Sequence, residues 1–263
     1  MATTATISSS APAASLPLAG RVAIVTGASR GIGRAIAIHL SSLGASLILG
    51  YASSSSSKLA DALAAELPSA VAVRADVSDE AGVRSLFDAA ESAFGGAAHI
   101  LVACAGLAIQ TYPSLATTAT ADFDAVFAVN TRGAFLCLRE AANRLRRGGG
   151  GRIVAVSSSL AATLLPGYAA YAASKAAVEA MVRVTAKELG PARVTVNCVA
   201  PGPVATELFF QGKSEEAVER FRAGHPMGRL GEVDDIVPAV GFLCTDAAEW
   251  VNGQVIRVNG GIA

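Results

Sequence analysis

The amino-acid sequence predicts an α/β protein in which one doubly wound parallel sheet of about seven strands has helices on both faces. Short apolar runs alternate with longer segments of helical periodicity from residue 21 onward. This alternation is typical of parallel strands joined by right-handed helical crossovers. Hydrophobic residues make up 52% of the 263 residues and charged residues only 16%. Such a composition suits a sheet that is buried on both faces.

The apolar runs and the helical patterns locate the elements along the chain. Strands are expected at 21–26, 45–50, 70–75, 99–104, 151–157, 193–199 and 253–258. Helices are expected between them at 31–43, 56–66, 79–94, 120–146, 168–189 and 232–244.

Several of these boundaries carry chemistry of their own. Ser78 is suited to cap the helix that opens with Asp79 and Glu80, whose carboxylates favour the positive end of the helix dipole. Gly190-Pro191 ends the helix that precedes it. Four consecutive glycines, 148–151, form a flexible connection into the next strand.

The first 17 residues differ in composition from the rest of the chain. They are rich in Ala, Ser and Thr and have no charged side chain, so residues 1–17 are predicted to be a disordered tail before one domain, 18–263. The tail is rich in serine and poor in acids, as plastid transit peptides are, but it is short and lacks their arginines. A cytoplasmic location is therefore expected, with a plastid as the alternative.

Charge and cysteine content exclude several classes of function. The 21 basic and 21 acidic residues cancel, and without a basic stripe no nucleic-acid partner is expected. No apolar run reaches the 18 or more residues that span a bilayer, so no membrane partner is expected either. The four cysteines show no C-x-x-C pair, which predicts free thiols and no metal site; they are Cys104, Cys137, Cys198 and Cys244.

A glycine-rich loop, Thr26–Gly33, follows the first strand. Its glycines, Gly27, Gly31 and Gly33, are spaced G-x-x-x-G-x-G rather than G-x-G-x-x-G. Both spacings suit the binding of a pyrophosphate, because a backbone without Cβ atoms lets this group approach the N-terminus of the next helix. The loop therefore predicts a dinucleotide site.

The choice of dinucleotide follows from a missing acid. An NAD site normally places Asp or Glu at the end of the second strand, where it binds the ribose 2′-hydroxyl. No acidic residue occurs between Gly27 and Ala60. The same segment contains Arg30, Lys58 and five consecutive serines, 53–57. A cation and hydroxyl groups suit a 2′-phosphate, so NADPH is the expected cofactor.

Tyr171 and Lys175 lie four residues apart on a predicted helix and thus on the same face. An ammonium held there favours the phenolate and makes the tyrosine a usable general acid. Ser158 stands thirteen residues before Tyr171 at the end of an apolar run, and its neighbour Ser157 should point to the opposite face of that strand. With the glycine loop, this set predicts a nicotinamide-dependent carbonyl reductase.

These motifs, in this order, resemble the short-chain dehydrogenase/reductase family over nearly all of residues 18–263. The details are most similar to the plant NADPH-dependent aldehyde reductase-like branch, and next to 3-oxoacyl-carrier-protein reductases. The resemblance implies a Rossmann fold and a catalytic set of Asn130, Ser158, Tyr171 and Lys175, in which Asn130 holds a water that links Lys175 to solvent. It also implies a set of cofactor-binding residues, namely Gly27, Ser29, Arg30, Gly31, Ile32, Gly33, Tyr51, Ala52, Ser53, Asp76, Val77, Ala105, Gly106, Tyr171, Lys175, Pro201, Gly202, Val204 and Thr206.

The sequence departs from this family after the fourth strand, where Asn-Asn-Ala-Gly is replaced by Ala103-Cys104-Ala105-Gly106. The missing asparagines put the stability of this strand end in doubt more than the chemistry. Cys104 has no cation beside it in sequence, so an inert thiol is expected rather than a redox-sensitive one.

The substrate is expected beneath a lid formed by 206–226, which carries Leu208, Phe209, Phe210 and Phe221. An apolar wall suggests a small apolar or aromatic aldehyde or ketone; the residues expected to line it are Leu164, Leu165, Tyr168, Leu208, Phe209 and Phe210. Phe209 and Phe210 have the alternative of packing on the core or on another subunit. A 3-oxoacyl-carrier-protein reductase is the alternative function. It would need a basic docking surface, which the five arginines between residues 132 and 147 could provide. A catalytically idle binding or scaffold protein is a further alternative.

The helices at 120–146 and 168–189 carry more apolar residues than one buried face needs. In the family that the chain resembles, these two helices form the main dimer interface and the C-terminal strand forms a second one. Two perpendicular twofold axes give D₂ symmetry, so a homotetramer is expected.

Overall fold

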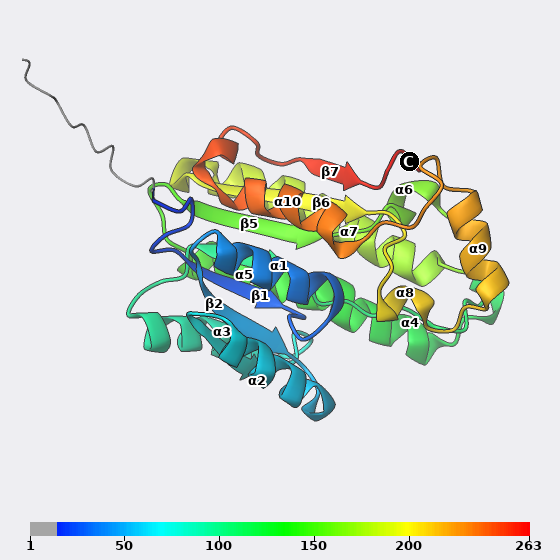
Figure 1. Ribbon diagram of the computed structural model, residues 1–263, viewed down its shortest axis with the longest axis horizontal. Helices are drawn as coiled ribbons and strands as arrows, with labels where there is room; N and C mark the ends of the chain where they lie inside the picture. The colour runs from blue at the N-terminus through cyan, green and yellow to red at the C-terminus, as the bar shows by residue number, and fades with distance from the viewer. Residues whose placement is uncertain (1–14) are drawn as a thin grey trace, which may run out of the picture.

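The computed structural model describes residues 15–263 and contains one seven-stranded sheet (Figure 1). The strand order is β3-β2-β1-β4-β5-β6-β7, and every neighbouring pair is parallel. The strands are β1 (Val22–Thr26), β2 (Ser46–Tyr51), β3 (Ala70–Arg74), β4 (Ile100–Ala103), β5 (Gly151–Val156), β6 (Val194–Pro201) and β7 (Val255–Val258). The predicted fold class is confirmed, with each strand within two residues of its expected limits. Residues 1–14 of the predicted tail lie outside the described residues.

Ten α-helices connect and cover the strands of the described chain. They are α1 (Gly31–Ser42), α2 (Ser57–Glu66), α3 (Glu80–Phe94), α4 (Thr120–Phe127), α5 (Ala134–Arg144), α6 (Leu160–Thr163), α7 (Ala169–Leu189), α8 (Glu207–Phe210), α9 (Glu215–Ala223) and α10 (Val233–Cys244). Between α4 and α5 the chain continues as a π-helix, Ala128–Gly133, so the helix expected at 120–146 is divided. The helix α3 is capped by Asp79, whose carboxylate accepts the amide of Ala81, and not by Ser78 as the sequence suggested.

The two faces of the sheet bury two separate apolar clusters. Successive strand side chains point to opposite faces, and accordingly Ile24 and Ile48 pack with residues of α3, α5 and α7, whereas Val25 and Leu47 pack with residues of α1 and α10. Figure 1 looks onto the sheet with α1 and α10 in front of it. Apolar residues on both faces of each central strand therefore account for the doubly wound arrangement.

The carboxyl ends of the strands form the functional edge of this fold. The strand order changes direction between β1 and β4, and ligands of open α/β sheets bind in the crevice outside such a switch point. There the hydroxyl oxygen of Thr26 accepts the amides of Cys104 and Ala105 at 3.0 and 3.1 Å. In Figure 1 the strand arrows point toward the end where α6, α8 and α9 gather.

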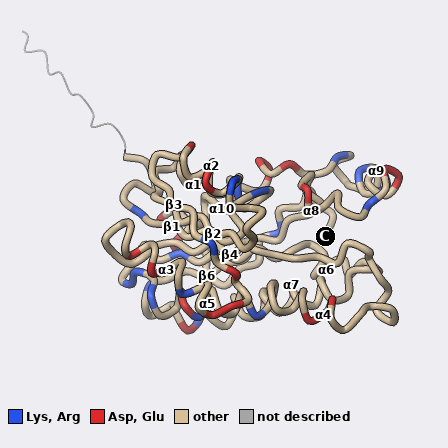
Figure 2. Tube along the Cα trace, turned by 90° about the horizontal axis from the view of Figure 1, so that it is seen from below, with Lys and Arg blue, Asp and Glu red and all other residues tan. Residues whose placement is uncertain are grey.

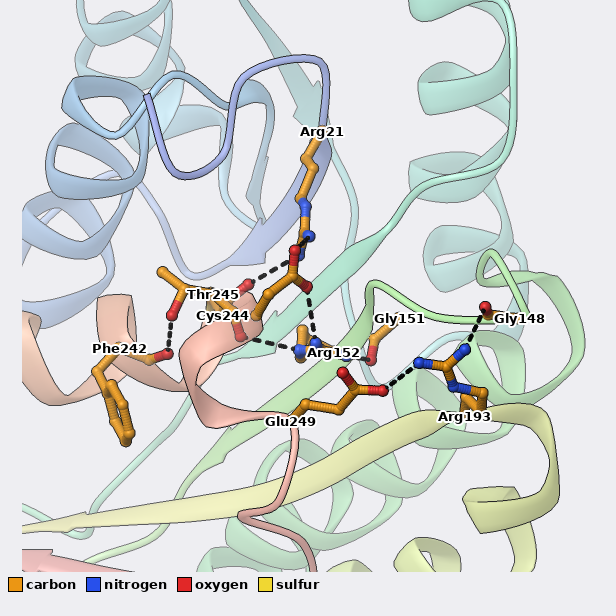
Figure 3. A network of polar contacts seen from close by, with 10 residues as sticks. Arg21, Gly148, Gly151, Arg152, Arg193, Phe242, Cys244, Thr245 and Glu249 are labelled. Atoms are coloured by element: carbon orange, nitrogen blue, oxygen red, sulfur yellow. Dashed lines mark hydrogen bonds and ion pairs between the residues drawn. The ribbon is translucent and has the colours of Figure 1, made fainter. Parts of the chain in front are cut away.

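The opposite end of the sheet is closed by a network of arginines (Figure 3). The side chain of Arg152 is 0% exposed and donates to Asp246 Oδ1 at 2.9 Å, to the carbonyl of Thr245 at 3.1 Å and to the carbonyl of Gly151 at 2.9 Å. Arg21 donates to the other carboxylate oxygen of Asp246 at 2.6 Å. This network joins the starts of β1 and β5 to the segment after α10.

The surface carries charges of both signs, interspersed over the chain (Figure 2), in keeping with the net charge of zero. Among residues 15–263 no helix combines the length and apolar character needed to cross a bilayer.

Candidate active site

The structure brings together the four residues expected to be catalytic near the carboxyl end of β5. Ser158 follows β5, Tyr171 and Lys175 lie on the first turns of α7, and Asn130 lies in the π-helix. The Lys175 ammonium is buried and lies 5.8 Å from the centre of the Tyr171 ring. The spacing of four residues thus places the ammonium beside the phenol, as the sequence predicted.

Asn130 is buried and held by both ends of its amide group. Its Oδ1 accepts the amide of Leu107 at 2.8 Å, and its Nδ2 donates to the carbonyl of Leu107 at 2.9 Å and to Ser174 Oγ at 3.0 Å. Ser174 Oγ in turn donates to the carbonyl of Tyr171 at 2.7 Å. The π-helix, a feature often found at functional sites, therefore connects the loop after β4 with the helix that carries Tyr171.

Lys175 donates to the carbonyl of Val156 at 2.8 Å, which fixes the ammonium at the end of β5. A Cβ at Gly106 would stand 3.5 Å from both Lys175 Nζ and Asn130 Oδ1. The side chains of Asn130, Lys175 and Thr26 help to line a cavity of about 10 Å³, close to the smallest volume that holds one water molecule.

Of the three consecutive serines, Ser158 is the one whose hydroxyl is left for a ligand. Ser157 Oγ donates to Glu179 at 2.8 Å, and Ser159 Oγ accepts a hydrogen bond from Asn259 Nδ2 at 2.9 Å; both side chains are buried. Ser158 Oγ accepts only the backbone amide of Leu160 at 3.2 Å and is half-buried.

The glycine loop has a geometry that side chains would block. Gly27 and Gly31 have φ angles of +67° and +54°, a region that favours glycine. A Cβ at Gly27 would lie 2.9 Å from the Cα of Ala105, and one at Gly33 only 2.2 Å from the carbonyl oxygen of Gly27. Ser29 of this loop is buried, while Ile32 is half-buried on the first turn of α1. The loop leads into the N-terminus of α1, where an anion is favoured.

The expected 2′-phosphate site lies at the carboxyl end of β2. Tyr51 is half-buried there, Ala52 and Ser53 are exposed, and Ser53 Oγ shares hydrogen bonds with Ser55 and Ser56 at 2.8 and 2.9 Å. Arg74, which sequence reasoning missed, pairs with Tyr51 in register and donates through Nε to the carbonyl of Ala52 at 3.2 Å.

Arg30 does not point toward this site in the structure. Its Nη1 donates to both carboxylate oxygens of Glu207 at 2.9 Å, which joins the glycine loop to α8. Both side chains are more than half exposed, at 54% and 56%.

The remaining residues expected to bind cofactor lie along the same edge. Asp76 accepts the amide and the hydroxyl of Ser78 at 2.9 and 2.8 Å, and Val77 is buried next to Gly133 of the π-helix. After β6, which ends at Pro201, the amide of Gly202 donates to the carbonyl of Val258 at 3.2 Å.

The segment then leads into α8. Val204 is buried and forms an isolated bridge with Gly231, and Thr206 caps α8 by accepting the amide of Phe209.

The expected lid forms two short helices, α8 and α9, and its aromatic residues pack mainly on one another. Phe209 lies edge-to-face with both Phe210 and Phe221 at 5.4 Å between ring centres. Leu208 and Phe210 are exposed, as are Leu164 and Leu165 in the connection between α6 and α7. Leu164 adopts a φ of +52°, an uncommon conformation for a branched side chain.

Sequence reasoning missed the loop after β4 as a partner of the lid. The Tyr112 hydroxyl donates to the carbonyl of Gln211 at 2.6 Å, and the Tyr112 ring lies 5.1 Å from the ring of Tyr168. A Cβ at Gly212 would meet the carbonyl oxygen of Gln110 at 1.9 Å. The sequence carries no signal for these contacts, because the partners are far apart in the chain, as Tyr112 and Gln211 are with a separation of 99 residues.

The whole described chain resembles known oxidoreductases. The family described as enoyl-(acyl carrier protein) reductase matches residues 27–263. An "NADPH-dependent aldehyde reductase-like protein, chloroplastic" of Arabidopsis thaliana is 57% identical over 94% of this chain and 95% of its own length. A "Short-chain type dehydrogenase/reductase" of Picea abies is 53% identical over 93% of both chains. The chain belongs to the short-chain dehydrogenase/reductase family.

Solved structures similar to this chain include complexes with NADP and NADPH. A short-chain dehydrogenase of Burkholderia cenocepacia in complex with NADP superposes with a TM-score of 0.85 at 35% identity, covering 93% of this chain and 98% of its own. A dehydrogenase/reductase of Sinorhizobium meliloti superposes with a TM-score of 0.86 at 38% identity, covering 94% and 96%. As a short-chain dehydrogenase/reductase with NADPH-dependent relatives, this protein is an NADP-dependent oxidoreductase.

The residues of the crevice fit NADPH. The glycine loop makes a tight turn at positive φ into the N-terminus of α1, which favours an anion such as a pyrophosphate, and no acidic residue lies between Gly27 and Ala60 to repel a 2′-phosphate. Within the described chain no group of three His, Cys, Asp or Glu side chains is placed to hold a metal ion.

The departure from the family at Ala103-Cys104 leaves this strand end anchored. The Thr26 hydroxyl accepts the backbone amides of Cys104 and Ala105, so a neighbouring side chain ties the end of β4 to β1. Burial raises the pKa of the Cys104 thiol to about 11, although the nearby Lys175 opposes this shift. Cys104 is thus a thiol and not a reactive thiolate at neutral pH.

Proposed function

We propose that this protein reduces the carbonyl group of small apolar or aromatic aldehydes and ketones, with Asn130, Ser158, Tyr171 and Lys175 as its catalytic set. The observation that carries the proposal is the position of the Ser158 hydroxyl and the Tyr171–Lys175 pair beside the crevice into which the glycine loop opens. The Arabidopsis relatives named NADPH-dependent aldehyde reductases support the substrate class.

Each residue of the set has a distinct task. Bound NADPH supplies the hydride. Ser158 donates a hydrogen bond to the carbonyl oxygen of the substrate, and Tyr171 donates the proton that this oxygen takes up. The ammonium of Lys175 stabilises the phenolate left behind, and a water in the cavity beside Asn130 returns a proton through Lys175.

Replacing the phenol tests this assignment. Tyr171→Phe should lower kcat by roughly 10²–10⁴ because only the general acid is removed, while NADPH binding, measured by fluorescence titration, should stay within about threefold. Ser158→Ala should lower kcat as well, whereas Ser159→Ala, the matched neighbour, should change it much less. A Tyr171→Phe variant that keeps half of kcat would refute the role of Tyr171.

A 3-oxoacyl-carrier-protein reductase is the second candidate. The family description that matches residues 27–263 names a carrier-protein substrate, although it names an enoyl and not a 3-oxoacyl group. A carrier protein is acidic and needs an unpaired basic surface. However, Arg144 pairs with Asp88, Glu91 and Glu140, and Arg139 pairs with Glu80. Arg139 and Arg144 are thus neutralised, whereas Arg132, Arg146 and Arg147 have no carboxylate partner among the described residues. A comparison of kcat/KM for benzaldehyde and an acetoacetyl thioester with NADPH decides between the two.

The names of two Arabidopsis relatives, both described as chloroplastic, favour the plastid alternative over a cytoplasmic location for this protein. A fluorescent reporter fused to the C-terminus of the full chain tests this proposal. Fluorescence confined to the cytoplasm would contradict it.

A further inference from the structure

Lys213, between α8 and α9, lies at the junction of the lid and the loop after β4. Its Nζ donates to Tyr112 Oη and to the carbonyl of Phe209, both at 2.6 Å. Aromatic rings surround the ammonium, with centres 4.3 Å away for Tyr112, 4.6 Å for Phe209 and 5.9 Å for both Tyr168 and Phe221. Such rings attract a cation through their negative faces.

The ammonium of Lys213 has no carboxylate partner among the described residues. Two of its three N–H donors are used by neutral oxygens, and the third remains for a ligand. Burial lowers the pKa of Lys213 to about 8, so most molecules carry the charge at pH 7. A half-buried charge of this kind is costly unless it is paired, and an anion at this place would supply the missing partner.

The position of Lys213 relates it to the candidate active site. Tyr168 lies directly before α7, one helical turn from Tyr171, and its ring lies 5.9 Å from Lys213 Nζ. Burial first, and then the neighbouring phenols Tyr112 and Tyr171, raise the pKa of Tyr168. One aromatic ring therefore separates the ammonium from the surroundings of the catalytic phenol.

We infer that Lys213 binds a carboxylate at the end of the substrate remote from the reacting carbonyl. The preferred substrates are then aromatic or apolar aldehydes and ketones that also carry a carboxylate group. The inference rests on the proposed reductase function and narrows its substrate class. A lysine that only fastened the lid would need its hydrogen bonds but not its charge, and this difference makes the two roles separable.

The experiment compares benzaldehyde with 3- and 4-carboxybenzaldehyde in the NADPH-dependent reaction, for the unmodified enzyme and for Lys213→Met and Lys213→Arg. A hydrogen bond to a charged group contributes about 1.5–3 kcal/mol, so Lys213→Met should lower kcat/KM for the preferred carboxylated aldehyde by roughly 10–100-fold. Its kcat/KM for benzaldehyde, which reports the loss of the lid's hydrogen bonds alone, should fall at least about fivefold less than this, and Lys213→Arg should keep the preference for the carboxylate.

An equal loss for charged and neutral aldehydes in Lys213→Met would overturn the inference and leave only the fastening role. No preference for a carboxylated aldehyde in the unmodified enzyme would overturn it too. If the unmodified enzyme reduces none of the aldehydes, the proposed function fails instead. In that case, calorimetric titration of the NADPH-loaded enzyme compares the binding of 4-(hydroxymethyl)benzoate with that of benzyl alcohol. Tighter binding of the carboxylate that is lost in Lys213→Met would still support the inference. Equal binding of the two compounds by the unmodified enzyme would overturn it.

Discussion

Replacing Asp246 by Asn should destabilise the fold without touching the candidate active site. The change removes the one carboxylate among residues 15–263 that pairs with the buried Arg152 and weakens the hydrogen bond from Arg21. Removing one partner of a buried ion pair costs about 3–5 kcal/mol. Because the Asp246 side chain is 66% exposed, water offsets part of this cost, and we expect a loss of about 2–3 kcal/mol.

Thermal unfolding followed by circular dichroism measures this loss. For a chain of this size 1 kcal/mol corresponds to roughly 2–4 °C, so Tm should fall by roughly 4–12 °C. The protein concentration is kept constant and NADPH is left out, because association and ligand binding both raise the apparent stability. Glu249→Gln is the matched control. Its pair with Arg193 is exposed on both sides, at 46% and 60%, and is worth less than about 1 kcal/mol. Equal melting temperatures for Asp246→Asn and Glu249→Gln would refute the reasoning.

The pH dependence gives the same reasoning a second check. Hydrogen bonding from Arg21 holds the pKa of Asp246 below its ordinary value. A carboxyl group whose pKa is lowered in the folded state contributes stability above its unfolded pKa of about 3.9, and this stability is lost as the pH falls through the folded value. The difference in Tm between the unmodified protein and Asp246→Asn should therefore be constant from pH 7 to 5. It should shrink only below about pH 4.

Three further predictions concern the cofactor, the lid and the assembly. Arg74→Ala and Arg30→Ala should each raise the KM for NADPH at least fivefold and leave that for NADH unchanged, because only NADPH carries the phosphate; equal effects on both cofactors would contradict this. Gly212→Ala should raise the KM for the aldehyde at least tenfold, because a Cβ at this position meets Gln110. Gly228→Ala is the control and should leave this KM unchanged, because Gly228 also has a positive φ but a Cβ there meets nothing within 4 Å. Light scattering should give about four times the 26.4 kDa mass of one chain, in line with the exposed apolar side chains on α4, α5 and α7; a mass near one chain would rule the tetramer out.

The sheet could be predicted from sequence because each strand is an apolar run and each connection has helical periodicity. This pattern does not show how a helix is hydrogen-bonded, and the prediction for 120–146 therefore missed the π-helix that holds Asn130. The resemblance to the family was nevertheless enough to place Asn130 near Lys175. Local pattern thus gave the element and the family resemblance gave the residue, while the contacts of Asn130 with Leu107 and Ser174 became visible only in the structure.

The side chains that the sequence did not reveal are those brought together by long-range contacts. Arg74 reaches the end of β2 only because β3 lies beside β2 in register. A cation near the end of the third predicted strand, 70–75, was the available signal, and it becomes informative only once the strand order is known. Lys213 likewise acquires its surroundings from Tyr112, 101 residues away.

The ion pair between Arg30 and Glu207 does not conflict with a role for Arg30 in binding the 2′-phosphate. Both side chains are more than half exposed, and exposed pairs contribute about 0–1 kcal/mol. A phosphate group has a larger charge and more acceptor oxygens, and hydrogen bonds to it contribute about 1.5–3 kcal/mol. A 2′-phosphate within reach of Arg30 would therefore compete successfully with Glu207, and the turn of one side chain would suffice. The expectation for Arg30 accordingly stays a prediction, with the comparison of NADPH and NADH in Arg30→Ala as its measurement.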